Sequence, residues 1–136
     1  MNYLIDTNVI SELKRPQPNQ KVLQWFASID NKSLYLSVLT LGEIRKGVDK
    51  LDNGQKKQAL LQWLEIDIPL WFDNRLLVID TNVANCWGKL QASATRPLPA
   101  IDSLLAATAL QHNLCLVTRN VKDFDYPQLI ILNLWQ

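Results

Sequence analysis

Short apolar runs alternate along the chain with longer segments in which apolar residues recur every three or four positions. The short runs predict strands buried on both faces, and the longer segments predict amphipathic helices that cover those strands. Strands are expected at residues 3–5, 34–36, 76–79, 114–117 and 129–134. Helices are expected at residues 7–14, 21–29, 41–51, 55–65, 81–90 and 104–111.

Capping residues and prolines mark where these elements begin and end. Ser37 and Asp80 each follow a strand and stand where a helix N-cap belongs. Pro16 ends the first helix, and Pro69 is expected to break the chain after the fourth, because proline cannot continue a helical hydrogen-bond ladder. Strands separated by helices pair in parallel, since a tight turn joins only antiparallel neighbours. The sequence therefore predicts an α/β fold, a three-layer α/β/α sandwich with a mainly parallel central sheet.

The composition fits one globular unit. The chain has 136 residues, 48% of them apolar and 20% charged, and no linker or block of like charge divides it. We therefore expect a single domain spanning residues 1–136. No apolar run reaches the roughly 18 residues of a membrane span, and the first residues lack a signal-peptide pattern, so a soluble cytoplasmic protein without membrane contact is expected. Cys86 and Cys115 are too few for a disulfide framework or a zinc site and are expected to be buried thiols.

Four carboxylates that are far apart in sequence are expected at one edge of this sheet. They follow the first strand, lie in the helix after the second strand, open the helix before the fourth strand, and lie in the loop after it. In an open parallel sheet, ligands bind beyond the carboxyl ends of the strands. Clustered carboxylates raise one another's pKa unless a hard cation compensates them, and an all-oxygen set suits Mg²⁺ or Mn²⁺. The four residues are Asp6, Glu43, Asp102 and Asp123.

Each of these carboxylates also has an ordinary structural explanation. Asp6 and Asp102 are placed to cap helices, and Glu43 and Asp123 to be solvated surface charges. The apolar neighbours of Glu43 place it near a buried seam, which favours a role beyond that of an exposed charge. The Asp-Thr-Asn sequence at Asp6 recurs at Asp80, where only the capping role is expected.

Four segments carry a family resemblance. They are residues 4–12 (LIDTNVISE), 39–44 (LTLGEI), 102–109 (DSLLAATA) and 117–124 (VTRNVKDF), and Trp87-Gly88 precedes the third. Together, and in this order, they resemble PIN-domain proteins, in particular the VapC-like, FitB-type ribonuclease toxins of bacterial toxin–antitoxin pairs. The resemblance implies a metal-dependent endoribonuclease that hydrolyses RNA phosphodiester bonds with Mg²⁺ or Mn²⁺.

The resemblance also assigns roles to individual residues. The acidic quartet of the family falls on Asp6, Glu43, Asp102 and Asp123, with Asp6 and Asp102 as the foremost metal ligands. Thr118 matches a polar residue that orients a ligand or water, and Asn8 and Asn120 match supporting polar positions. Some PIN nucleases carry Asp where this chain has Asn120, a difference that bears on how a second metal is held. In a two-metal site, one ion activates water while the other stabilises the leaving oxygen.

Partners follow from the same resemblance. Family members form homodimers and are held inactive by a cognate antitoxin that inserts a basic side chain among the acidic residues. Outside the quartet, fourteen basic residues face nine acidic ones, and Arg45, Lys46 and Lys50 follow Glu43 closely. These three are candidate RNA contacts, and the alternative is a solvated helix face. Four aromatic residues are candidates for a partner surface, although core packing is the more common role of such residues: Trp25, Trp63, Trp71 and Phe72.

Two other functions and one other mechanism are alternatives to the metal-dependent nuclease. A haloacid-dehalogenase-like phosphatase would use Asp6 as nucleophile, but the second Asp that this chemistry needs is replaced by Asn8. A metal-free acid–base mechanism would start from His112, which stands alone near the end of a helix that leads away from the site. A non-catalytic PIN-like module that binds RNA or protein remains the main alternative. The intact quartet argues against it, because a scaffold gains nothing from uncompensated carboxylates.

Overall fold

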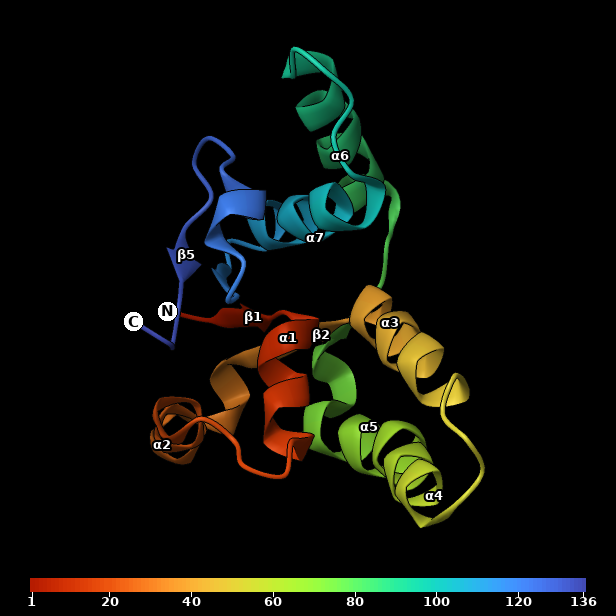
Figure 1. Ribbon diagram of the computed structural model, residues 1–136. Helices are drawn as coiled ribbons and strands as arrows, with labels where there is room; N and C mark the ends of the chain where they lie inside the picture. Colours follow the sequence, from red (N-terminus) through yellow and green to blue (C-terminus); the bar gives the residue numbers. More distant parts are fainter.

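Five parallel strands form the centre of the fold, in the order β3-β2-β1-β4-β5 (Figure 1). The computed structural model describes all residues from Met1 to Gln136. The strands are β1 (Tyr3–Ile5), β2 (Leu34–Ser37), β3 (Leu76–Leu77), β4 (Cys115–Val117) and β5 (Ile131–Leu132). In the middle strand β1, Leu4 is opposite Tyr35 of β2 and Leu116 of β4. All pairings are parallel, which confirms the predicted sheet.

Helices cover both faces of the sheet and make it the middle of three layers (Figure 1). Because side chains alternate along a strand, Ile5 packs into a core with α1 to α5, whereas Leu4 packs into a second core with α7. This arrangement confirms the predicted α/β/α sandwich. One layer contains α1 (Thr7–Ile10), α2 (Gln20–Ser28), α3 (Val38–Asp49), α4 (Gln55–Gln62) and α5 (Ile68–Phe72), and the other α6 (Thr81–Ser93) and α7 (Ala100–Gln111).

The prediction that Pro69 breaks the chain is wrong. The helix α4 continues through a π-helical turn, Trp63–Asp67, into α5. The wider turn changes the i−4 hydrogen-bond register that proline would disrupt, and Pro69 lies in the first turn of α5, where a missing N–H is tolerated. The first helix likewise continues from α1 as a 3-10 helix, Ser11–Lys14, as far as predicted.

The other sequence predictions differ from the structure at the edges of elements. The edge strands β3 and β5 are each two residues long, shorter than predicted, because an edge strand has only one neighbour to pair with. The cysteines are unpaired as expected, although Cys86 is only half-buried. No helix has both the length and the apolar composition needed to cross a bilayer.

The aromatic residues considered for a partner surface belong to the core of the α1–α5 layer. Trp63 and Phe72 are buried, and Trp25 and Trp71 are half-buried and pack against the same core. The ring of Phe26 lies between those of Trp25 and Trp71, with centroid separations of 5.1 and 5.8 Å. Core packing therefore accounts for these aromatic side chains.

Candidate active site

Asp6 lies at the carboxyl end of the middle strand and is only 7% exposed. Its backbone N–H donates to the carbonyl oxygen of Val117 at 2.9 Å, which continues the pairing of β1 with β4 past the end of β1. Oδ1 accepts the backbone N–H of Thr7 at 2.7 Å and caps α1. Oδ2 accepts the hydroxyl of Thr118 at 2.7 Å and the side-chain amide of Asn8 at 3.3 Å. Asp6 therefore caps α1 with Oδ1 and contacts the side chains of the candidate site with Oδ2.

Asn8 ties the two strand ends together around Asp6. Its amide also donates to the Thr118 hydroxyl at 3.4 Å, and its Oδ1 accepts the backbone N–H of Arg119 at 3.1 Å. The Thr118 hydroxyl in turn accepts the backbone N–H of Asn120 at 3.1 Å. Asn120 therefore contributes through its backbone, whereas Asn8 and Thr118 contribute through their side chains.

Glu43 reaches the site from α3. The Thr7 hydroxyl donates to its Oε1 at 2.5 Å, which links α1 and α3 across 36 residues of sequence. The expectation that Glu43 lies near a buried seam is wrong, because its side chain is exposed. Successive helical residues are rotated by about 100°, so the burial of Ile44 does not extend to the residue before it.

Asp102 and Asp123 complete the acidic group from the other side of β1. Asp102 is half-buried in the first turn of α7, where Pro99 holds the N-cap position, so the capping explanation for Asp102 is wrong. A negative charge is nevertheless favoured there by the helix dipole. Asp123 is exposed on a 3-10 helix, Val121–Phe124, that follows β4 and is anchored by the buried ring of Phe124.

The negative charges of the acidic group raise the pKa values of its buried and half-buried members. Burial raises the pKa of Asp6, the hydrogen bonds that it accepts oppose this shift, and the charges of Glu43 and Asp102 raise the pKa further. Burial also raises the pKa of Asp102, and the charges of Asp123 and Glu43 add to the effect. The parallel topology thus brings Asp6, Glu43 and Asp102 into electrostatic range of one another, and Asp123 into range of Asp102.

The acidic group is open rather than closed. No set of three or more His, Cys, Asp or Glu side chains is compact enough to hold a metal ion by itself. Asp6 and Asp102 are the two members that are at least half-buried, whereas Glu43 and Asp123 are exposed. A divalent ion at this edge would therefore take one or two carboxylates directly and complete its shell with water, the mode that Mg²⁺ favours.

Two side chains of this region were missed by the sequence analysis. Thr7 stands inside the Asp-Thr-Asn motif, but its hydroxyl bond to Glu43 depends on where α3 lies. Tyr126 lines a pocket together with Asp123. Burial raises the pKa of its hydroxyl, and the charges of Asp102 and Asp123 raise it further. No motif in the sequence signals Tyr126.

The remaining candidates lie outside the acidic group. Arg45 pairs with Glu65 at 2.8 Å and with Asp49 at 3.6 Å, so its charge is already compensated. Lys46 is exposed on the same helix and Lys50 at its C-cap, and neither forms an ion pair. Their contact with RNA remains a prediction. His112 is exposed at the C-cap of α7, the far end of this helix from Asp102.

Comparison with known proteins identifies the family. The model of the PIN domain matches residues 3–126. The chain belongs to the PIN-domain family. It is similar to toxin FitB of Neisseria gonorrhoeae, with 40% identity over 135 residues that cover 97% of each chain. It is also similar to a VapC ribonuclease of Sinorhizobium fredii, with 31% identity over 98% of this chain and 97% of that protein.

A solved structure agrees with this assignment. The crystal structure of FitAcB from Neisseria gonorrhoeae superposes on this PIN-domain protein with a TM-score of 0.91 and 39% sequence identity. The match covers 98% of this chain and 99% of the other. The PIN-domain sandwich expected from the four sequence segments is therefore confirmed.

Proposed function

We propose that this PIN-domain protein is a metal-dependent endoribonuclease that hydrolyses RNA phosphodiester bonds and acts as the toxin of a bacterial toxin–antitoxin pair. The observation that carries the proposal is the buried carboxylate of Asp6, placed at the carboxyl edge of the sheet within electrostatic range of Glu43 and Asp102. A scaffold would avoid such a cluster, whereas a nuclease needs it to hold cations. One relative carries the name toxin and another the name ribonuclease.

Mg²⁺ or Mn²⁺ is the proposed cofactor. The donor set consists of carboxylate oxygens alone, which suits these hard ions. Burial raises the pKa values of Asp6 and Asp102, the neighbouring carboxylates add to the effect, and a bound cation would favour the ionised form of both groups. Asp6 and Asp102 are the proposed direct ligands, with Glu43 and Asp123 assisting. Bound here, a divalent ion lowers the pKa of a water molecule and offsets the charge that develops on the phosphate.

The chain's own side chains prepare the site for this chemistry. The Thr118 hydroxyl and the Thr7 N–H hold both oxygens of Asp6 in place and favour its ionised form. The Thr7 hydroxyl holds Oε1 of Glu43, which leaves Oε2 as an acceptor for a proton released by the attacking water. Asn8 keeps the ends of β1 and β4 in register, so that Asp6 and Thr118 keep a fixed geometry.

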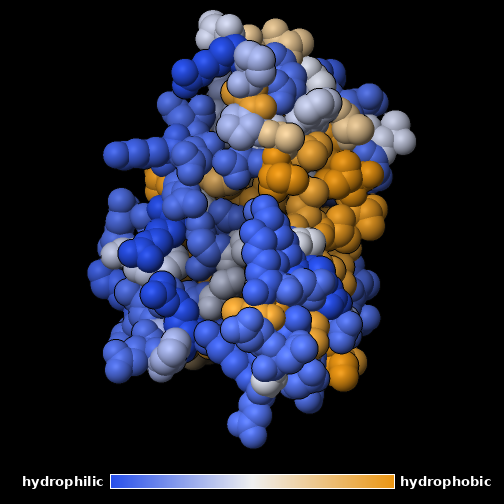
Figure 2. Space-filling model, turned by 45° about the vertical axis from the view of Figure 1, so that its right-hand side comes forward, coloured by the Kyte–Doolittle hydropathy of each residue, from blue (hydrophilic) through white to orange (hydrophobic).

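A cognate antitoxin and a homodimer belong to the proposal. A basic side chain inserted among the carboxylates would relieve the same repulsion as the metal and would compete with it. Figure 2 shows apolar side chains gathered on one side of an otherwise hydrophilic face. Several large apolar side chains are exposed, among them Leu70 at 76% and Val78 at 58%, and exposed apolar surface of this kind favours contact with another chain.

The test is cleavage of total bacterial RNA by purified, antitoxin-free protein with Mg²⁺, with Mn²⁺ or with EDTA. We expect discrete fragments that require metal and are lost in Asp6→Asn and Asp102→Asn. Asp80→Asn is the matched control, because Asp80 has the same Asp-Thr-Asn context, and asparagine still caps a helix. It should cleave like the unmodified protein.

The opposite result is equally informative. If the folded protein binds divalent metal but leaves RNA intact under every condition, the nuclease is excluded. The non-catalytic module that binds RNA or protein then becomes the better description.

A further inference from the structure

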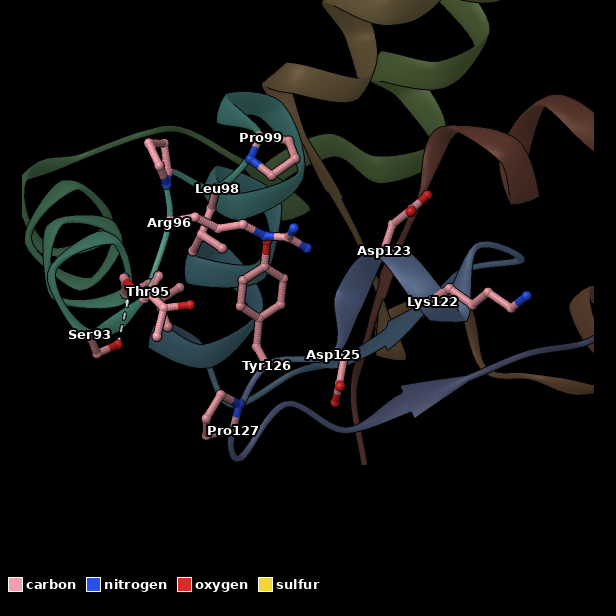
Figure 3. A pocket seen from close by; sticks show the side chains of 13 residues that line it. Ser93, Thr95, Arg96, Leu98, Pro99, Lys122, Asp123, Asp125, Tyr126 and Pro127 are labelled. Atoms are coloured by element: carbon pink, nitrogen blue, oxygen red, sulfur yellow. Dashed lines mark hydrogen bonds between the residues drawn. The ribbon is translucent and has the colours of Figure 1, made fainter.

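A pocket of about 560 Å³ opens beside the acidic site (Figure 3). One wall is the end of α6 and the loop that leads to α7, residues 93–99, and the other is the segment 122–127 after β4. Its volume falls within the roughly 300–1,000 Å³ of small-molecule binding clefts. Asp123 lines this pocket and belongs to the acidic group, where its charge raises the pKa of Asp102. A molecule in the pocket therefore lies next to the acidic group.

Tyr126 gives the pocket an aromatic wall. The side chain is half-buried, and the ring of Phe124 packs against it with a centroid separation of 6.4 Å. The ring lines the same pocket as the carboxylate of Asp123. Aromatic rings in such positions are the usual platforms on which unpaired RNA bases stack.

Arg96 supplies the cation of the pocket. Figure 3 shows its guanidinium group pointing toward the hydroxyl end of Tyr126, whereas Lys122 points away from both. Arg96 is exposed and forms no ion pair with a carboxylate, so its donors are available. A guanidinium plane stacks on a base and also donates hydrogen bonds to it.

The loop that carries Arg96 is held in place before any ligand arrives. Gln91 of α6 accepts the backbone N–H of Leu98 at 3.0 Å and donates to its carbonyl oxygen at 3.2 Å. Pro97 and Pro99 restrict the backbone on both sides of Leu98. A pre-ordered loop loses little conformational entropy on binding, as a recognition site requires.

We propose that this pocket binds one unpaired nucleobase of the RNA, next to the phosphate that is cleaved, with the ring of Tyr126 as stacking platform and Arg96 as a cationic hydrogen-bond donor at the hydroxyl end of that ring. The inference rests on the proposed ribonuclease function and assigns it a substrate contact outside the carboxylates. A neutral base fits better than a phosphate, because Asp123 and Asp125 balance the charges of Arg96 and Lys122 in the lining and leave no net positive charge to hold an anion. The same carboxylates accept hydrogen bonds from the N–H groups of a base.

Binding of a short, labelled, single-stranded RNA of mixed sequence tests the inference, with Ca²⁺ in place of Mg²⁺ and fluorescence anisotropy as the readout. Its competitor is the same ribose-phosphate chain without bases. The unmodified protein should prefer the intact RNA by about tenfold, the size expected for one stacked base. Tyr126→Leu should lose this preference, whereas Tyr126→Phe, which keeps the ring, should retain it.

Arg96→Gln should weaken binding severalfold. Its matched control is Lys32→Gln, since Lys32 is exposed before β2 at the opposite edge of the sheet. Equal preference for the two RNA chains in the unmodified protein overturns the inference, and so does full preference in a folded Tyr126→Leu variant. Failure of the proposed function has a different signature, because RNA would then bind with this preference but not be cleaved with Mg²⁺ or Mn²⁺.

Discussion

The Thr118 hydroxyl donates a hydrogen bond of 2.7 Å to Oδ2 of Asp6 across 112 residues of sequence. The same hydroxyl accepts the backbone N–H of Asn120, so its single proton is directed at the carboxylate. The bond joins the carboxyl ends of β1 and β4, the two central strands of the acidic site. It also lowers the pKa of a carboxyl group that burial would otherwise raise further.

Thr118→Val should shift the pH dependence of RNA cleavage. Valine keeps the shape but removes the donor, so the pKa of Asp6 should rise and the acidic limb of the pH–rate profile should move to higher pH. Loss of the acceptor for the Asn120 N–H should also lower the free energy of unfolding by about 1–3 kcal/mol. The pH–rate profile is measured with a labelled copy of an RNA that the protein cleaves in the total-RNA experiment.

Thr108→Val is the matched control for Thr118→Val. Thr108 is also buried, but its hydroxyl donates within α7 to the carbonyl oxygen of Leu104. It should lose stability without any shift of the pH profile. An unchanged profile in Thr118→Val would show that its hydroxyl does not control Asp6.

The stability of Asp6→Asn relative to the unmodified protein should rise between acidic and neutral pH, while cleavage is abolished. The pKa of Asp6 is raised above its ordinary value of 3.8, so the folded protein holds this proton more tightly than the unfolded chain. Ionisation of Asp6 above the raised pKa therefore costs folding free energy, and Asn removes that cost. The cost disappears below pH 3.8, where Asp6 is protonated in both the folded and the unfolded state of the unmodified protein.

Urea unfolding of the unmodified protein and Asp6→Asn at neutral and acidic pH measures this difference. The relative stability of Asp6→Asn should be higher at neutral pH than near pH 3. Asp80→Asn should show no gain at either pH, because Asp80 is an exposed cap. A gain of equal size at both pH values would assign the effect to something other than the ionisation of Asp6.

Divalent metal should raise the melting temperature of the protein. An ion that binds only the folded state stabilises it by mass action, by about 2.7 kcal/mol at a hundredfold excess over Kd. The increase should be lost in Asp6→Asn and Asp102→Asn, and it should shrink at acidic pH as the carboxylates take up protons. An equal increase in both variants would place the metal elsewhere. Differential scanning calorimetry with Mg²⁺, Mn²⁺ or EDTA makes the measurement.

Asp80→Ala should destabilise the fold and spare the chemistry. Asp80 accepts the backbone N–H of Val83 at 2.9 Å and caps α6, so its loss should lower the free energy of unfolding by about 0.5–2 kcal/mol. Specific activity of the folded fraction should not change. A loss of activity beyond the loss of folded protein would mean that the second Asp-Thr-Asn motif also takes part in the site.

Much of the fold follows from local patterns in the sequence. Apolar runs such as 3–5 and 115–117 form buried strands, because a strand between two helical layers buries its side chains on both faces. The helices between these strands require parallel pairing. Parallel pairing in turn places the residue after β1 and the residues after β4 at one edge. The sequence therefore predicts that Asp6 lies at the same edge of the sheet as the residues after the fourth strand. The adjacency of β1 and β4, which only the structure shows, brings Asp6 and Thr118 into hydrogen-bond contact.

Only the tertiary structure decided how these residues face one another. The exposure of Glu43 and its bond with Thr7 depend on the rotation of α3 against α1, and continuation of the helix through Pro69 depends on a π turn. The pocket at Tyr126 forms where the segments 93–99 and 122–127 meet, and no sequence pattern indicates that these two segments lie side by side. Sequence patterns report which residues are buried and which elements they form. The distance between side chains on separate elements is set by how those elements pack, and packing is a property of the whole folded chain.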